Sequence, residues 1–230
     1  MALLGLRIAN VSVSFTGLPV PVLSLPALEI APGERVAVTG PSGSGKSTLV
    51  NVITGLERPS SGMVLWGEID IARLPEGKRD RWRAENIGLV MQDFHLFAGL
   101  SALDNVLLPV RLRMKGAARF AERAHALMNR VGLSRHDQPV ATMSRGEMQR
   151  VAVARALLRQ PGVVIADEPT ASLDPESGAA VAELLLELAV EEGTTLLVVS
   201  HDERLVARMD RRIRLSAGRV AVDPNVEAAP

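Results

Sequence analysis

The order of sequence patterns along this 230-residue chain predicts an α/β fold built on a mostly parallel sheet. Short apolar runs typical of buried strands alternate with stretches of helical character, an order that favours parallel strands joined by crossover helices. Hydrophobic residues make up 47% of the chain but aromatic residues only 3%, so the apolar residues are chiefly Val, Leu, Ala and Ile. Parallel strands that are covered by helices on both faces have this composition.

The N-terminal part of the chain is rich in predicted strands. Residues 6–15 alternate between apolar and polar side chains, as a half-buried strand does. Pro32 and Gly33 mark a turn between the next two predicted strands, and the glycine-rich residues 40–45 precede a predicted helix. In this part we expect strands at 6–15, 27–31, 35–39, 63–69 and 87–91 and a helix at 46–54.

The middle of the chain, from Ser101 to Gln160, has a helical pattern. Ser101 with Asp104 resembles a capping box, and Ser144 with Glu147 forms a clear one ahead of an amphipathic helix. We therefore expect a helical lobe inserted between two core strands. Beyond it we expect a strand at 163–167, a helix from Pro175, a strand at 195–199 and a short helix after His201.

Composition excludes several classes of function. Lys and Arg number 26 and Asp and Glu also number 26, so no net charge attracts the whole molecule to nucleic acid or to an anionic membrane. Cys is absent, which excludes disulfides, zinc thiolates and cysteine nucleophiles. Residues 1–7 do not have the pattern of a signal peptide, and no apolar run approaches the roughly 18–20 residues of a spanning helix. We expect a cytoplasmic protein that reaches a membrane only through a partner.

A glycine-rich segment matches the phosphate-binding pattern G-x-x-x-x-G-K-[ST]. Glycines let successive backbone N–H groups surround an anion, and the N-terminus of the following helix adds a partial positive charge. We expect Lys46 to bind the β- and γ-phosphates of a nucleotide and the Ser47 hydroxyl to ligate Mg²⁺. The expected phosphate-binding residues are Gly40, Pro41, Ser42, Gly43, Ser44, Gly45, Lys46, Ser47 and Thr48.

An acidic pair, Asp167 and Glu168, ends the apolar strand 163–167. The carboxyl end of a buried parallel strand is where such a sheet presents groups to a ligand. We expect Asp167 to hold Mg²⁺ through water and Glu168 to polarise an attacking water. The alternative is a solvated strand end, which the presence of the phosphate-binding pattern at 40–48 disfavours.

A third motif is more specific. Residues 143–157, Met-Ser-Arg-Gly-Glu-Met-Gln-Arg-Val-Ala-Val-Ala-Arg-Ala-Leu, resemble the LSGGQ signature and its helix in the ABC ATPase family. The chain resembles that family over nearly its whole length, with the five motifs in the family's order. They are the P-loop at 40–48, a Q-loop at Gln92, the signature at 143–150, Walker B at 163–168 and a switch histidine at His201.

This resemblance implies a fold and an activity. The fold would be a P-loop NTPase cassette with an N-terminal antiparallel β subdomain, a mostly parallel core sheet and an inserted helical subdomain. One ABC ATPase domain would span 1–230, with the β and RecA-like core at 1–92 and 158–222, the helical subdomain at 93–157 and a flexible tail at 223–230. The activity would be hydrolysis of Mg·ATP bound between two head-to-tail copies of the chain.

The signature residues would contact the γ-phosphate that the partner copy binds. By this resemblance Ser144, Arg145, Gly146 and Glu147 belong to the nucleotide site. A free helix N-terminus and a hydroxyl favour an anion there, although Ser144 is equally suited to an ordinary capping box. The family usually has Gly where this chain has Arg145. The guanidinium would either occupy space at the dimer interface or contact a phosphate or carboxylate.

Other site residues follow from the same resemblance. Gln92 would ligate Mg²⁺, His201 would contact the γ-phosphate and Asp174 would belong to the D-loop at the dimer contact. Asp174 precedes Pro175 and is also a good N-cap, so both interpretations stay open. Phe15 would stack on adenine, or would be a core residue at a strand end.

Residues 89–106 and 51–62 resemble the branch that contains lipoprotein-release, macrolide-export and FtsE-type ATPases. The resemblance implies an integral-membrane permease as partner, at the inner face of the cell membrane, with a lipid-linked or hydrophobic substrate or force transmission across the membrane. The apolar residues Phe94, Leu96 and Phe97 suit a groove for the permease, or internal packing. A regulator of a cell-envelope hydrolase is an alternative. A nucleic-acid-associated ATPase is another, but no long insertion or basic surface supports it, and we expect no nucleic-acid partner.

Overall fold

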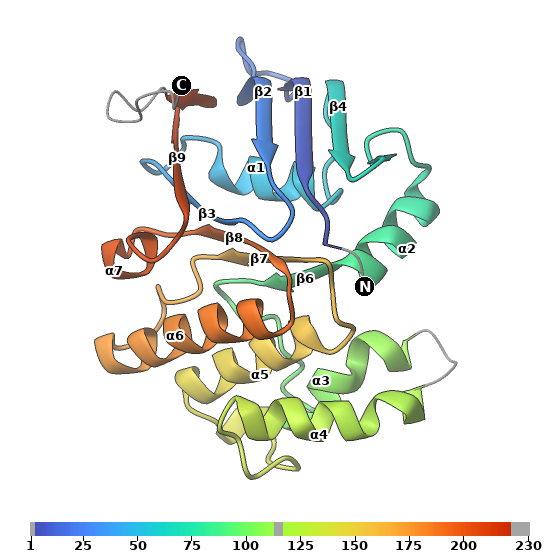
Figure 1. Ribbon diagram of the computed structural model, residues 1–230, viewed down its shortest axis with the longest axis vertical. Helices are drawn as coiled ribbons and strands as arrows, with labels where there is room; N and C mark the ends of the chain where they lie inside the picture. The colour runs from blue at the N-terminus through green and yellow to red at the C-terminus, as the bar shows by residue number, and fades with distance from the viewer. Residues whose placement is uncertain (1–2, 113–116, 222–230) are drawn as a thin grey trace. The chain divides into compact units, whose positions relative to one another are not determined.

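The computed structural model describes residues 3–112 and 117–221 in two compact units (Figure 1). The terminal unit comprises 3–83 and 195–221, and the central unit comprises 84–112 and 117–194. The central unit contains the described part of the expected helical lobe together with strands and a further helix. The expected tail at 223–230 lies outside the described residues, and the expected three-part division of the chain stays a prediction.

The terminal unit contains an antiparallel sheet in the order β2-β1-β4-β5. Its strands are β1 (Leu6–Val13), β2 (Leu23–Ile30), β4 (Ser61–Trp66) and β5 (Ile69–Asp70). In β1 the buried positions are Leu6 and Ile8, then Val11 and Val13. The alternation changes phase because the pairing with β4 has a bulge between Ala9 and Ser12. The antiparallel sheet expected from the family resemblance is confirmed.

A second set of strands in the terminal unit is mostly parallel, in the order β10-β9-β3-β8. Strand β3 pairs in parallel with β8 and with β9, and β10 pairs antiparallel with β9. Every residue of β8 is buried, as a run of apolar residues inside a parallel sheet requires. The elements are β3 (Arg35–Thr39), α1 (Lys46–Ile53), β8 (Thr195–Val199), α7 (Glu203–Val206), β9 (Arg211–Ser216) and β10 (Arg219–Ala221).

The central unit pairs strands β6 (Ile87–Val90) and β7 (Val163–Asp167) in parallel and carries most of the helices. These are α3 (Ala102–Arg111), η1 (Ala117–Phe120), α4 (Ala121–Arg130), η2 (Val140–Thr142), α5 (Arg145–Leu157) and α6 (Pro175–Glu191). Helix α5 lies close to β6, since a Cβ at Gly88 would be 2.5 Å from the carbonyl oxygen of Ala156. Helices therefore occupy the range where the lobe was expected.

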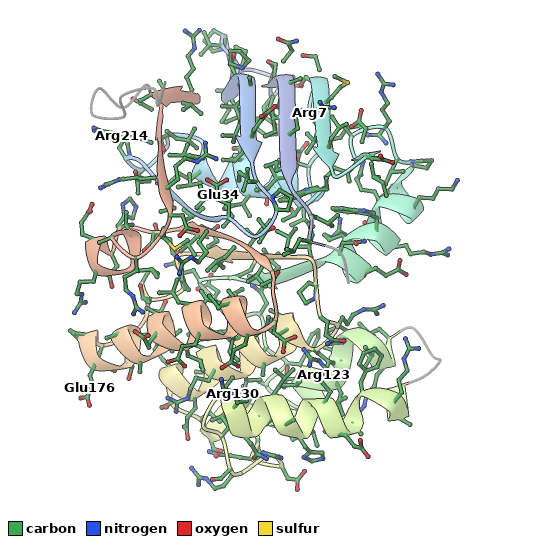
Figure 2. All side chains as sticks on the ribbon, viewed as in Figure 1. Arg7, Glu34, Arg123, Arg130, Glu176 and Arg214 are labelled. Carbon is green, nitrogen blue, oxygen red and sulfur yellow. The ribbon has the colours of Figure 1, made fainter. Side chains whose placement is uncertain are left out.

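Two arginines of α4, labelled in Figure 2, connect this helix to the end of α6. The Arg123 guanidinium lies 2.7 Å from the carboxylate of Glu192 and also donates to two backbone carbonyl groups at the end of α5. Arg130 pairs with Glu191. Surface pairs of this kind contribute little alone, but the bonds of Arg123 to main-chain oxygens fix where α4 lies in the unit.

Helix α2 (Glu76–Asn86) and strands β5, β9 and β10 were not predicted from the sequence. The strand expected at 63–69 ends at Trp66, because the chain turns at Gly67, with a left-handed φ of 58°, and returns as the antiparallel β5. Helix α2 buries only Trp82 and so lacks an apolar stripe. The signature helix also ends at Leu157, earlier than the expected Gln160, which has a left-handed φ of 53°. Among the described helices none combines the length and the low charge that crossing a bilayer requires.

Candidate functional site

The P-loop joins β3 to α1 in the terminal unit. The Lys46 side chain folds back over the loop, where its ammonium nitrogen donates to the carbonyl oxygens of Gly40 at 2.8 Å and Pro41 at 3.0 Å. The hydroxyl oxygen of Ser44 is buried and has no hydrogen-bond partner among the described residues. A buried donor without a partner is costly, so the loop suits an anion that would accept from it.

Glycine is required at two positions of this loop. Gly40 has a φ of 148°, and a Cβ there would lie 2.2 Å from the carbonyl oxygen of Leu215 and 2.8 Å from Ser44 Oγ. Gly45 has a left-handed φ of 98° at the N-terminus of α1. Glycine at both positions lets the loop turn closely into the start of α1, as a phosphate cradle at a helix N-terminus requires. The residues present therefore fit the phosphates of a nucleoside triphosphate.

His201 lies in the same unit as the P-loop. Strands β3 and β8 are parallel neighbours, with Val38 opposite Val199, so the segments that follow them leave the same edge of the sheet. The P-loop follows β3, and His201, which is exposed, follows β8. The backbone N–H of Asp202 donates to Ser200 Oγ at 3.0 Å, which fixes the turn that carries the histidine.

Phe15 is 43% exposed in the β1–β2 connection, so the alternative of a core residue is wrong. This connection is anchored beside the phosphate loop. The backbone N–H of Val22 bonds to the carbonyl oxygen of Val13, and a Cβ at Gly45 would lie 3.0 Å from the carbonyl oxygen of Val22. An exposed aromatic ring on a fixed hairpin is suited to stacking on a base.

The central unit brings Gln92, Asp167 and Glu168 to one sheet edge. Strands β6 and β7 are parallel neighbours, with Val90 opposite Ala166, and these residues follow or end the two strands. Glu168 has a left-handed φ of 48°, a strained conformation for a residue with a side chain. Local strain of this kind is common where a side chain must be aimed at a ligand.

The signature segment begins α5 with a complete capping box. Ser144 Oγ accepts from the backbone N–H of Glu147 at 3.2 Å, and the Glu147 carboxylate accepts from the backbone N–H of Ser144 at 2.8 Å. The bond from the Ser144 N–H is the main reason that the pKa of Glu147 is lowered. The start of α5 also lies close to α6, because a Cβ at Gly146 would be 3.3 Å from Ser177 Oγ. The predicted cap is confirmed.

Asp174 caps α6, as one of its two interpretations predicted. Its carboxylate accepts from the backbone N–H groups of Glu176 at 3.1 Å and Ser177 at 2.9 Å. These bonds, that of Ser177 first, lower the pKa of Asp174. The D-loop interpretation concerns a second copy of the chain and stays a prediction.

Arg145 contacts two other segments of the central unit. Its Nε donates to the carbonyl oxygen of Ser172 at 2.9 Å, and its guanidinium carbon lies 5.1 Å from the centre of the Phe94 ring. The Ser172 hydroxyl also bonds to the carbonyl oxygen of Gln92, at 3.5 Å. The expected contact of Arg145 to a phosphate or carboxylate concerns a bound dimer and stays a prediction.

The apolar residues after Gln92 divide into a buried and an exposed group. Phe94 is buried, so internal packing is correct for this residue, whereas Phe97 is 59% exposed. The backbone of Phe97 is held on both sides by the fully buried Asn105, which accepts from its N–H at 2.7 Å and donates to its carbonyl oxygen at 3.1 Å. The ring therefore faces outward from a fixed backbone.

Arg155 also fixes the loop after β6. Its guanidinium donates to the carbonyl oxygens of Phe94 at 2.5 Å and His95 at 2.6 Å, and burial lowers its pKa. Phe94 and His95 both have left-handed φ angles, of 58° and 48°. These roles of Arg155, Asn105 and Ser172 could not be predicted, because they depend on an unusual backbone path.

The expected site residues thus form one group in each unit. The terminal unit holds the P-loop, Phe15 and His201, and the central unit holds the glutamine, the acidic pair, the signature segment and the α6 cap. An open cavity of about 710 Å³ in the terminal unit contains none of them. Arg7, Glu29, Glu34 and Arg211 contribute to its lining, and the last two form an ion pair, so its charges are largely balanced.

Comparisons with known proteins agree with this arrangement. Residues 23–171 match the family model described as ABC transporter. The lipoprotein-releasing system ATP-binding protein LolD of Hydrogenovibrio crunogenus is 44% identical over 203 residues, which cover 87% of this chain and 88% of that protein. LolD of Pseudomonas fluorescens is 44% identical over 198 residues, which cover 86% of this chain and 87% of that protein.

Solved structures show the same similarity. A dimeric post-hydrolysis state of the ATP-binding cassette MJ0796 with ADP and Pi has a TM-score of 0.87 and 33% identity, over 97% of this chain and 100% of that one. CbiO1 of Clostridium perfringens, part of the transporter complex cbiONQ, has a TM-score of 0.83 and 31% identity, over 94% of this chain and 86% of that one.

Proposed function

This chain belongs to the ABC transporter family, and we propose that it is the ATP-hydrolysing subunit of a transporter that releases lipid-linked or similarly hydrophobic molecules from a membrane. The observation that carries this proposal is the P-loop, whose buried Ser44 hydroxyl and folded-back Lys46 fit a triphosphate. The similarity to LolD proteins over most of the chain supports the lipoprotein-release type.

ATP would bind first at the terminal unit. The backbone N–H groups of residues 40–48 would surround the phosphates, and Lys46 would exchange its two carbonyl partners for phosphate oxygens. Ser47, Gln92 and Asp167 would hold Mg²⁺, which neutralises phosphate charge when bound. His201 would contact the γ-phosphate.

Hydrolysis would use Glu168 as the base. Glu168 would accept a proton from the attacking water as the water oxygen bonds to the γ-phosphorus. The bond from that phosphorus to the oxygen bridging it to the β-phosphate would break, and ADP would leave with the bonding electrons. The products would be ADP and inorganic phosphate, the ligands present in the similar MJ0796 dimer.

A second copy of the chain would complete the site. Residues Ser144 to Glu147 offer a helix N-terminus and a hydroxyl to the γ-phosphate bound by the other copy. Asp174 would contact that copy as well. Because each chain supplies both surfaces, two copies would bind head to tail with two nucleotides between them.

The membrane partner would bind at Phe97, at the inner face of the cell membrane. An exposed aromatic ring is a typical anchor for a partner. Because the backbone of Phe97 is already fixed by Asn105, binding would bury the ring with little further loss of loop conformational entropy. The partner proposed is an integral-membrane permease. A regulatory role toward a cell-envelope hydrolase would use the same surface, so the same ring would be required.

The test of the function combines two measurements. The purified chain should hydrolyse Mg·ATP and lose activity with EDTA, and a tagged chain should co-purify from detergent-solubilised membranes with an integral-membrane protein that stimulates the ATPase after reconstitution. Stimulation by DNA or RNA, with no membrane protein bound, would instead support the nucleic-acid alternative.

Phe97→Lys should remove co-purification of the permease and leave basal ATPase activity within about twofold of wild type, because a charge in the centre of an apolar contact is strongly unfavourable. Val190→Lys is a matched control, since Val190 is 64% exposed on α6 of the same unit. Equal co-purification by both variants would contradict a permease contact at Phe97.

Phe15→Ala should raise the KM for ATP by about two- to tenfold, because stacking of aromatic rings contributes roughly 0.5–1.5 kcal/mol. Phe15→Tyr should keep the wild-type value. Leu18→Ala serves as control, since Leu18 is also exposed in the same connection. A KM for ATP unchanged in Phe15→Ala would remove this residue from the nucleotide site.

A further inference from the structure

Arg145 occupies a position where a cation is normally unfavourable. It is the first residue of α5, where the helix dipole and the unpaired N–H groups repel positive charge. Two groups offset this repulsion within the central unit, the carbonyl oxygen of Ser172 at 2.9 Å from Nε and the face of the Phe94 ring at 5.1 Å from the guanidinium carbon. A guanidinium can make both interactions at once, because its planar group lies over a ring while its N–H groups donate at the edge.

The two partners of Arg145 belong to different parts of the proposed ATPase site. Phe94 is two residues after Gln92, and its carbonyl oxygen is held by Arg155. Ser172 lies between Glu168 and the α6 cap Asp174, and its hydroxyl bonds to the carbonyl oxygen of Gln92. One side chain at the start of the signature helix therefore contacts the loop after β6 and the turn after β7.

The surroundings leave this contact little freedom. Phe94 is buried and has a left-handed backbone, so its ring is held in place. The start of α5 is fixed by the capping box of Ser144 and Glu147 and by its close approach to Ser177. A shift of the loop after β6 would therefore change the contacts of Arg145 with Phe94 and Ser172, together with those of Arg155.

We propose that Arg145 is a positioning residue that links the Gln92 loop to the signature helix and to the segment before Asp174 within one chain. A displacement of residues 92–97, where the partner is proposed to bind, would reach Ser144 and Asp174 through this side chain. The inference rests on the proposed function, because it assigns nucleotide contacts to the residues that Arg145 positions. The strength of this link is the coupling free energy between Arg145 and its partners, which a double-mutant cycle measures.

The experiment compares Arg145→Gln, Phe94→Leu and the double variant in the wild-type chain. Each single variant should lower kcat about two- to fivefold, since a cation–π contact contributes roughly 0.5–1 kcal/mol. The double variant should lose less than the product of the two single losses, because both changes break the Arg145–Phe94 contact. Arg145→Lys, which keeps the charge, should recover part of the lost rate.

Arg135→Gln is the matched control. Arg135 also contacts the signature capping box, 3.6 Å from Glu147, but its side chain is 72% exposed. It should keep the wild-type kcat. Multiplicative rate losses in the double variant, or a fully active Arg145→Gln, would overturn the link.

Amide hydrogen exchange gives a readout that does not depend on catalysis. In Arg145→Gln, residues 92–97 and 170–174 should exchange about two- to fivefold faster, while Arg135→Gln should match wild type. Unchanged exchange in both segments would contradict the link. If the wild-type chain did not hydrolyse ATP but Arg145→Gln still exchanged faster in both segments, the proposed function would be refuted and the link would stand.

Discussion

Glu168→Gln should lower ATP hydrolysis by about 10²- to 10⁴-fold, because an amide cannot accept the proton of the attacking water. ATP affinity should stay within about twofold of wild type, since the P-loop contacts do not change. The side chain keeps its size, and the left-handed backbone at position 168, with a φ of 48°, is equally strained for Glu and for Gln. Steady-state phosphate release and equilibrium nucleotide binding measure the two effects.

The same variant should also accumulate as a dimer when ATP is present. Hydrolysis would normally end the closed state, so a chain that binds ATP without cleaving it should remain paired. Size-exclusion chromatography with and without ATP tests this. Glu176→Gln is the control, because Glu176 (labelled in Figure 2) is exposed in the first turn of α6 and has no proposed role in catalysis. A variant that binds ATP but stays monomeric at every concentration would contradict the head-to-tail dimer.

The parts of the fold that the sequence predicted well are those with strong local signals. Strands β3, β7 and β8 are short apolar runs whose residues are almost all buried. The N-caps Ser144 and Asp174 were predictable because their side chains bond to backbone groups only two or three residues away. In each case the information lies within one element.

The elements that were missed depend on distant partners. Strand β9 places arginines beside the buried Ile213 and Leu215, and two of these arginines pair with acids outside the strand, Arg211 with the distant Glu34 and Arg212 with Glu203 of α7. A pattern so rich in charge gives little evidence of a strand until these partners are known. The same holds for α2, where most of the helix surface is polar.

The candidate site, like the fold, has parts with local sequence signals and parts that depend on contacts between distant segments. Motif spacing alone led to the roles proposed for Lys46, Glu168 and His201, since the chemistry requires these residue types in this order. The contacts of Arg145 could not be predicted, because they need a left-handed backbone at Phe94 and His95, where the residue types give no reason to expect one. The groups proposed to act on ATP therefore have local sequence signals, whereas the groups that hold their loops in place do not.

Lys46→Ala should weaken binding of Mg·ATP about 100-fold, because charge-assisted hydrogen bonds contribute roughly 1.5–3 kcal/mol each and Lys46 would make them to the β- and γ-phosphates. The folded chain should lose little stability. The two bonds that Lys46 makes now are to carbonyl oxygens at the loop surface, which water can replace. Isothermal titration with ATP and thermal unfolding measure the two quantities. Lys78→Ala, an exposed position on α2, should leave both unchanged. If Lys46→Ala bound Mg·ATP as tightly as wild type, the P-loop could not be the phosphate site, and the roles proposed for His201 and Ser44 would fail with it.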